Sequence, residues 1–226
     1  MNTCYDIIGD IHGCSETLKA LLHKLGYEYT SGAYRHADRL AVFLGDFIDR
    51  GPRQREVIEL VRPMIEGGSA LAVMANHEFN AIAFATPDSK GGHLRQRTAK
   101  NRKQHRAFLD AYPPDSPDYR EVVAWFKTLP LWLDLGALRV IHACWDPDAI
   151  GYVSQRVDGE AFITDEVLID ACEEGSEAYL AIETILKGKE IPLPSGATFR
   201  DKDGTVRHHI RIRWWDARAR SHRDAY

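Results

Sequence analysis

Short apolar runs that end in carboxylate, amide and imidazole side chains constrain the fold of this chain more than any other feature. Such runs are typical of buried parallel strands, and open α/β sheets place their sites where these strands end. We therefore expect the polar side chains that follow them to gather at one edge of a sheet. The runs and their polar successors are residues 5–8 with Gly-Asp-Ile-His-Gly (9–13), 40–44 with Gly-Asp-Phe-Ile-Asp-Arg-Gly (45–51), 71–74 with Ala-Asn-His-Glu (75–78), and 138–141 with His142.

Amphipathic helices are predicted between the first three strands. Leucines recur at helical spacing in residues 15–25, and apolar residues do the same in residues 53–65. Glycines follow both segments and favour helix ends there. Strands and helices that alternate at this spacing indicate right-handed parallel crossovers. A further helix is expected near residues 79–85.

The second half of the chain predicts a helix at residues 119–129 and then a strand pair at 131–135 and 138–142. The strand pair would begin a second sheet, which makes the expected fold class an α/β sandwich of two sheets flanked by helices. Beyond Pro147 we expect an acidic helix at about residues 164–186. A hairpin turning at Asp203-Gly204 should follow, with its second arm at residues 206–214.

Residues 90–106 carry seven Lys or Arg residues and two His residues, and no acid. A solvated cationic helix is the common meaning of such a run. Here the run lies directly downstream of the third polar cluster, so an equally weighted alternative is that part of it caps the site and attracts an anionic substrate.

Composition sets further bounds on the class of protein. The chain has 226 residues, 44% of them hydrophobic, which suffices for one full core in a single domain. The net charge of −4 gives no general reason to expect nucleic acid or an anionic membrane as a partner. No signal peptide, no transmembrane span and no disulfide framework are recognisable, so we expect a cytoplasmic protein.

The order of the motifs resembles the calcineurin-like metallophosphoesterases. Arg50 in the second motif and Glu78 in the third are similar to the phosphoprotein-phosphatase branch of that family. That branch holds bacterial serine/threonine protein phosphatases and symmetrical dinucleoside-tetraphosphate hydrolases. The resemblance covers residues 5–147 and implies a four-layer α/β/β/α sandwich of two mixed sheets. We expect one domain over residues 1–226, with a basic cap at about 86–118 and a helix and hairpin excursion at about 155–226.

The chemistry of phosphate ester hydrolysis suggests a role for each polar residue. Two divalent ions about 3.5–4 Å apart can share a hydroxide that attacks the phosphoryl group and can neutralise its oxygens. Asp46 is the best candidate for the carboxylate that bridges both ions. Asp10 and His12 would hold the first ion, and Asn76 and His142 the second. These nitrogen and oxygen ligands suit Mn, Fe, Zn, Ni or Co and do not choose among them; of these metals we expect Mn.

The remaining motif residues are assigned to substrate and proton transfer. His77 would act as the general acid towards the leaving oxygen, with Asp49 orienting it. Arg50 presents a planar fork to phosphate oxygens, and Asn76 would also contact the substrate. Glu78 is expected to support the site or the N-terminus of a helix rather than to bind metal.

Two departures from the family pattern affect these expectations. Ala75 stands where the family usually has Gly. The family also closes its second metal site with a further His near the C-terminal end, commonly after a Gly at a strand end, and the part of this chain after His142 contains no Gly-His pair. We expect either that the sequence ends before that ligand or that His222, His208 or His209 takes its place.

The sequence thus predicts a metal-dependent phosphoric ester hydrolase. Its substrate would be a phosphoprotein or a dinucleoside polyphosphate, with no sequence-specific nucleic acid partner and no membrane partner. The motifs leave the choice of substrate and the oligomeric state open. The alternative is a non-catalytic protein that binds metal or nucleotide and has an incomplete second metal site.

Overall fold

The computed structural model describes residues 4–157, 161–200, 204, 206–216 and 218. Its central sheet has three parallel strands in the order β1 (Cys4–Ile8), β4 (Arg39–Phe43) and β5 (Ala70–Ala72). The three strands lie within the predicted apolar runs or overlap them by most of their length. Their carboxyl ends point the same way, so the polar segments that follow them meet at one edge, as predicted.

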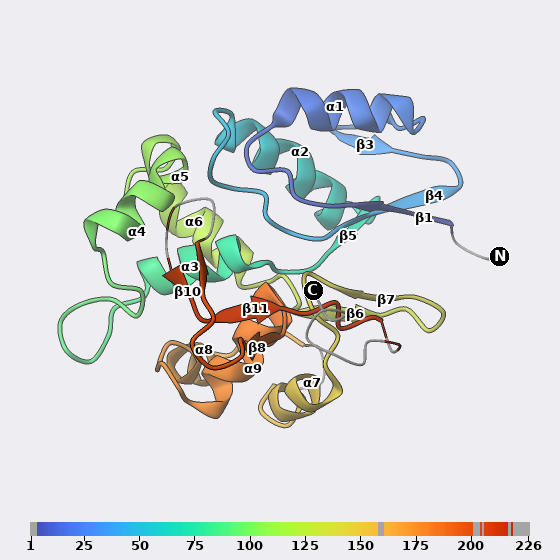
Figure 1. Ribbon diagram of the computed structural model, residues 1–226. Coiled ribbons are helices and arrows are strands. Elements are labelled where there is room, and N and C mark those ends of the chain that lie inside the picture. The colour runs from blue at the N-terminus through green and yellow to red at the C-terminus, as the bar shows by residue number, and fades with distance from the viewer. Residues whose placement is uncertain (1–3, 158–160, 201–203, 205, 217, 219–226) are drawn as a thin grey trace.

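Two helices cover one face of this sheet. These are α1 (Ser15–Lys24) and α2 (Gln54–Glu66), with a small hairpin of β2 (Glu28–Thr30) and β3 (Ala33–Arg35) beside them (Figure 1). Leu18 and Leu22 of α1 and Val57 and Val61 of α2 are buried on the inward stripe of each helix. A fully buried leucine or valine side chain contributes roughly 1.5–3 kcal/mol, so these stripes fix the helices on the sheet.

An antiparallel strand pair, β6 (Trp132–Asp134) and β7 (Arg139–Ile141), lies on the opposite face of the central sheet (Figure 1). Val42 and Val73 from the sheet layer and Val140 from the pair form a separate small core between the two layers. The fold is therefore α/β with more than one sheet, as expected.

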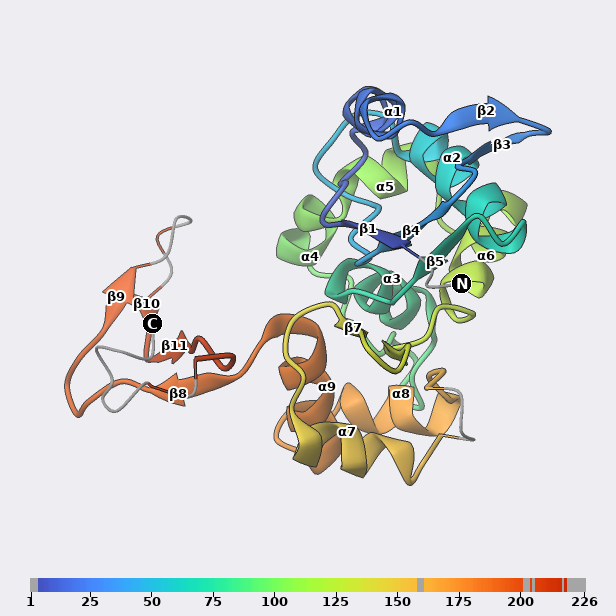
Figure 2. The same ribbon diagram turned by 90° about the vertical axis from the view of Figure 1, so that its right-hand side faces the viewer.

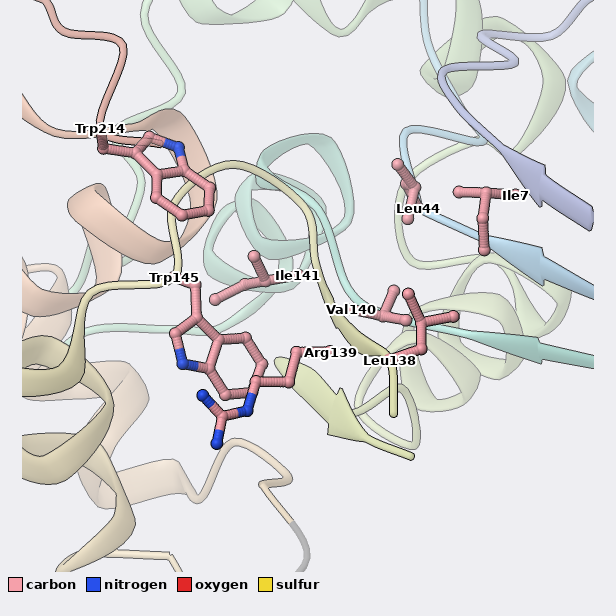
Figure 3. A pocket seen from close by; sticks show the side chains of 8 residues that line it. All are labelled: Ile7, Leu44, Leu138, Arg139, Val140, Ile141, Trp145 and Trp214. Atoms are coloured by element: carbon pink, nitrogen blue, oxygen red, sulfur yellow. The ribbon is translucent and has the colours of Figure 1, made fainter. Parts of the chain in front are cut away.

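An apolar groove of about 420 Å³ opens between the central sheet and β7. Ile7 and Leu44 line one side of it and the tryptophans Trp145 and Trp214 line the other (Figure 3). The indole N–H of Trp214 donates to the carbonyl oxygen of Ala143, 2.8 Å away, and this bond joins the C-terminal region to the segment after β7.

Helices α3 (Asn76–Ala85), α4 (Ala99–Gln104), α5 (Arg106–Ala111) and α6 (Pro117–Phe126) follow β5 and form one end of the molecule (Figure 1). Helix α3 begins three residues before the predicted position, so Asn76 and His77 belong to its first turn. Residues 90–106 are not one cationic helix, because most of this run is loop and only α4 and the start of α5 are helical.

The C-terminal region contains α7 (Pro147–Ser154), α8 (Asp165–Ala171), α9 (Glu177–Lys187) and four short strands. The prediction of a single acidic helix at 164–186 is wrong, because a turn between α8 and α9 divides this segment into two helices. Gly175 adopts φ +87°, and the Ser176 hydroxyl then accepts a hydrogen bond from the backbone N–H of Tyr179, which starts α9.

The predicted strand over 206–214 is also shorter and divided. It forms β10 (Val206–Arg207), paired with β9 (Phe199–Arg200), and β11 (His209–Arg211), paired with β8 (Glu190–Pro192). Gly204 has φ +79°, whereas its neighbour Asp203 in the predicted turn lies outside the described residues. These strands extend beyond α9 and away from the central sheet (Figure 2). No helix of the described residues is both long and apolar enough to cross a membrane.

Candidate active site

Four loops bring carboxylates and imidazoles together at the carboxyl end of the sheet. The carboxylate of Asp46 lies at the centre: its Oδ2 atom is 3.3 Å from His12 Nε2 and 3.9 Å from His142 Nε2. His12 Nε2 is also 3.6 Å from Asp10 Oδ2. Ligand atoms of Asp10, Asp46 and His142 lie within 4.8 Å of one another, and so do those of His12, Asp46 and His77.

The Nδ1 atoms of His12 and His142 each have a backbone hydrogen-bond partner. His12 Nδ1 lies 2.7 Å from the carbonyl oxygen of Ile48, and His142 Nδ1 lies 2.7 Å from that of Leu44. A carbonyl oxygen only accepts, so each Nδ1 donates a proton to it and each Nε2 is left directed towards Asp46. His12 Nε2 is buried and has no hydrogen-bond partner among the described residues. A buried nitrogen that lies beside carboxylate oxygens and makes no hydrogen bond is what a metal-binding imidazole presents, so this arrangement fits a metal ion.

Backbone strain is concentrated in the same loops. His12, Asp46, Asp49 and Arg50 all adopt the left-handed region, with φ between 45° and 68°. Residues other than glycine visit this region rarely and at a cost, and such residues cluster at functional sites. Of these residues, His12 and Asp46 belong to consecutive loops, and their side chains meet at the centre of the site.

Close contact between the first two loops explains one glycine of each motif. The N–H of Gly51 donates to the carbonyl oxygen of His12, and a Cβ on Gly51 would lie 2.2 Å from that oxygen. A Cβ on Gly13 would lie 2.1 Å from the side-chain nitrogen of Gln54. Only glycine permits the loops to approach so closely.

Glu78 supports the loop that carries Asp46. Its carboxylate is fully buried and accepts hydrogen bonds from the backbone N–H groups of Asp46, Phe47 and Ala75, at 2.9, 2.9 and 3.2 Å. Burial, and next the charge of Asp46, raise the pKa of Glu78 to about 7. Ala75 has φ −112°, an ordinary extended conformation, so the departure from Gly at this position costs no backbone strain.

His77 and Asp49 form the predicted pair. His77 Nδ1 lies 2.6 Å from Asp49 Oδ2, and the backbone N–H of His77 donates to Asp46 Oδ1. Burial by itself would lower the pKa of His77, but the hydrogen bond to Asp49 and the nearby negative charges raise it above its ordinary value. The imidazole is therefore biased towards the protonated form that a general acid needs.

His105 is a site residue that the sequence interpretation did not single out. It lies between α4 and α5, is 4% exposed, and its Nδ1 atom is 2.8 Å from Asp49 Oδ1 and 3.0 Å from Asp49 Oδ2. Its position within the cationic run was the available signal, since that run lies directly downstream of the third polar cluster. Part of the run thus does reach the site.

The other predicted residues are less closely engaged. Asn76 is the first residue of α3, beside His77, and Arg50 is exposed with no hydrogen bond or ion pair to any described residue. Among the described residues, the groups of clustered metal-binding side chains include neither His208, which lies between β10 and β11, nor His209, the first residue of β11. His222 lies outside the described residues.

Comparison with known families agrees with this arrangement. The sequence model of the family described as calcineurin-like phosphoesterase matches residues 5–155 of this chain, which include all four polar clusters. The chain belongs to the calcineurin-like phosphoesterases. As a member of this family of metallophosphoesterases, it is expected to use divalent metal ions, and the His and Asp groups around Asp46 are the described residues that could hold them.

Several curated members of the family are similar in sequence. The asymmetrical bis(5'-nucleosyl)-tetraphosphatase PrpE of Bacillus velezensis is 36% identical over 68% of this chain and 61% of its own length. The symmetrical bis(5'-nucleosyl)-tetraphosphatase of Aromatoleum aromaticum is 30% identical over 74% of this chain and 52% of its own length. The chain thus spans about half to three fifths of the length of these relatives.

A solved structure shares the fold. A mutant form of a cold-active protein tyrosine phosphatase aligns with a TM-score of 0.50 and 16% identity over 83% of this chain and 57% of its own. At this identity the likeness concerns the fold alone.

Proposed function

We propose that this calcineurin-like phosphoesterase is a dinuclear-metal hydrolase that cleaves a dinucleoside polyphosphate. The observation that carries the metal assignment is the pair of Nε2 atoms, on His12 and His142, that face the Asp46 carboxylate. Asp10 and His12 would hold one ion and Asn76 and His142 the other, with Asp46 shared. Mn is the favoured metal, and Fe, Zn, Ni or Co would also suit these ligands.

Bound ions would supply an activated water and neutralise charge on the phosphoryl oxygens. The chain's own residues supply the rest. Arg50 follows Asp49 directly, is exposed and has no partner among the described residues, so its guanidinium is free to bind phosphate oxygens, and Asn76 adds an amide at the same edge of the sheet. Glu78 holds the Asp46 loop in its strained conformation through the three backbone hydrogen bonds.

His77 is proposed as the general acid. Its Nδ1–H is taken up by Asp49, which leaves Nε2 to give a proton to the leaving oxygen. Asp49 keeps its charge in spite of burial: burial alone would raise the pKa of Asp49, but the hydrogen bonds of His105 and His77 outweigh it and hold that pKa below its ordinary value. An ionised Asp49 both orients the imidazole and stabilises its positive charge.

The activities by which the relatives are named favour a dinucleoside polyphosphate over a phosphoprotein as substrate, because both tetraphosphatase types are represented among them. The two types differ in which anhydride bond they cleave. The motif residues do not distinguish symmetrical from asymmetrical cleavage. A cytoplasmic location would suit such a substrate.

The test is an assay of the purified protein with added Mn against diadenosine tetraphosphate and a phosphopeptide in parallel. We expect hydrolysis of the dinucleotide, and separation of the products shows whether cleavage is symmetrical, to two ADP, or asymmetrical, to AMP and ATP. Faster turnover of the phosphopeptide would reject the substrate proposed. No turnover of either substrate, or of p-nitrophenyl phosphate, would favour the alternative of a non-catalytic binding protein.

A further inference from the structure

Asp49 has two imidazole partners, and only one of them can face a substrate. His77 belongs to the first turn of α3 and lies beside Asp46. His105 approaches the same carboxylate from the junction of α4 and α5. Its backbone is fixed there, because its N–H donates to the carbonyl oxygen of Asn101 and its carbonyl oxygen accepts the N–H of Leu109.

Apart from its contact with the Asp49 carboxylate, the His105 ring lies among aromatic side chains. The centroids of Phe84 and Phe108 are 5.4 and 4.8 Å from the centroid of the imidazole. Its Nε2 atom is buried and has no hydrogen-bond partner among the described residues. Burying a polar nitrogen without a partner is costly, so the ring is tolerated here for what its Nδ1–H does.

The Nδ1–H of His105 gives the second oxygen of the Asp49 carboxylate its hydrogen bond. Oδ2 receives His77 Nδ1, whereas His105 is the sole side-chain donor to Oδ1 within the described part of the chain. The backbone of Asp49 is fixed separately, since its N–H donates to Gln54 Oε1 at 2.7 Å. Removing His105 would leave one carboxylate oxygen buried and unpaired, and the carboxylate could then rotate to recover a partner.

We infer that His105 is a positioning residue: it holds the Asp49 carboxylate in the orientation in which Oδ2 receives the Nδ1–H of His77. The inference rests on the proposed function, because positioning matters only if His77 protonates a leaving group. It assigns to the cationic segment a role inside the site, beside any attraction of an anionic substrate.

The test compares His105→Leu, which removes the donor at similar volume, with His105→Asn, whose amide nitrogen can occupy the place of Nδ1. Each is assayed on p-nitrophenyl phosphate, a good leaving group, and on phenyl phosphate, a poor one that depends more on the general acid. His93→Leu is the matched control, a histidine of the same segment with no described contact to Asp49.

We expect His105→Leu to lower kcat for phenyl phosphate about 10–100-fold, the usual cost of losing a group that orients a site residue, with a smaller loss for p-nitrophenyl phosphate. KM and metal content should stay unchanged, and His105→Asn should recover most of the rate. In a His77→Asn background, His105→Leu should have no further effect, because the two residues act through one proton transfer.

Equal losses on both substrates, or a further loss in the His77→Asn background, would overturn the inference and leave His105 a purely structural residue. An unchanged His105→Leu rate would overturn it too. If the His105→Leu protein does not fold, His105→Gln replaces it. The amide nitrogen of Gln reaches past the position of His105 Nδ1, so this variant also lacks a donor at that position. An inactive wild-type protein would reject the proposed function together with this inference, whereas the outcomes above reject the inference alone.

Discussion

Asp46 Oδ2 and His12 Nε2 lie 3.3 Å apart, and the other ring nitrogen of His12, Nδ1, donates to the carbonyl oxygen of Ile48. The contact joins the loops after β4 and β1, both with strained backbone. A carboxylate oxygen and an imidazole nitrogen at this separation could both bind one divalent cation. Metal should therefore stabilise the folded protein as well as activate it.

Asp46→Asn should lose metal and activity together. The amide removes the negative charge shared by both proposed ions and leaves a neutral oxygen in its place. Metal analysis after gel filtration and the rate on p-nitrophenyl phosphate measure the two effects. Asp38→Asn, an exposed aspartate before β4, is a suitable control. An Asp46→Asn protein that keeps its metal would refute the bridging role.

His77→Asn should keep the metal and slow turnover about 10²–10⁴-fold, the usual weight of general acid–base catalysis. The expected loss is larger on phenyl phosphate than on p-nitrophenyl phosphate. Metal content is measured on the same samples. Because ligand atoms of His77 lie within 4.8 Å of those of His12 and Asp46, loss of metal in this variant would instead make His77 a ligand.

The second metal should bind more weakly than the first. Within the described residues, Asn76, His142 and the shared Asp46 are the proposed ligands, without the further histidine that the family commonly adds. Metal analysis at limiting Mn should give nearer one equivalent than two, and activity should rise with excess Mn. His142→Ala should deepen this dependence and leave the first equivalent in place. Tight binding of two equivalents by the His142→Ala protein would contradict the assignment.

Glu78→Gln should destabilise the fold by about 1–3 kcal/mol, the cost of leaving a buried hydrogen-bonding group without its partner. One carboxylate oxygen becomes an NH₂ group that faces backbone N–H groups of Asp46, Phe47 or Ala75. Urea unfolding of the metal-free protein measures the change. Glu59→Gln, on the exposed side of α2, should change the free energy of unfolding by less than about 0.5 kcal/mol.

Asp146 should contribute stability that depends on pH. Its Oδ1 atom accepts the N–H groups of Asp148 and Ala149 at the start of α7, and its Oδ2 atom is 2.6 Å from Lys189 Nζ. Burial would raise the pKa of Asp146, but Lys189 and the backbone bonds hold it below the ordinary value. Since the folded pKa is the lower one, this stability is present above the unfolded pKa and is lost as the pH falls through the folded pKa.

Asp146→Asn keeps the helix cap and removes the charge. At neutral pH we expect a loss of less than about 1 kcal/mol, because Lys189 is partly exposed. The difference from wild type should shrink in acid, below the ordinary aspartate pKa of about 3.9. The free energy of unfolding of both proteins is measured in urea at neutral pH and at a pH below about 3.9. A difference between wild type and Asp146→Asn that does not change with pH would show that the ion pair contributes nothing.

The sequence by itself determined the central sheet and the identity of the clustered residues. The apolar runs before Asp10, Asp46 and Asn76 are too short and too uniform for surface helices, and parallel strands must end at one edge. Local hydrophobic pattern is sufficient for this because it acts over neighbouring residues. The helix starts were less certain: α3 begins at Asn76 because Glu78 accepts the Ala75 N–H, a contact that apolar periodicity does not record.

Only the tertiary structure decided how His105 is used and how α8 and α9 pack against each other. His105 and Asp49 are 56 residues apart, and no local pattern links them; the contact depends on how α4 and α5 pack against the β4–α2 loop. Gly175 and Ser176 are local signals for the break in the predicted acidic helix, whereas the packing of α8 against α9, with Leu168 and Ile182 buried, is a tertiary contact. Pairing and packing between distant segments depend on the whole chain, and a one-dimensional pattern of residue types does not contain them.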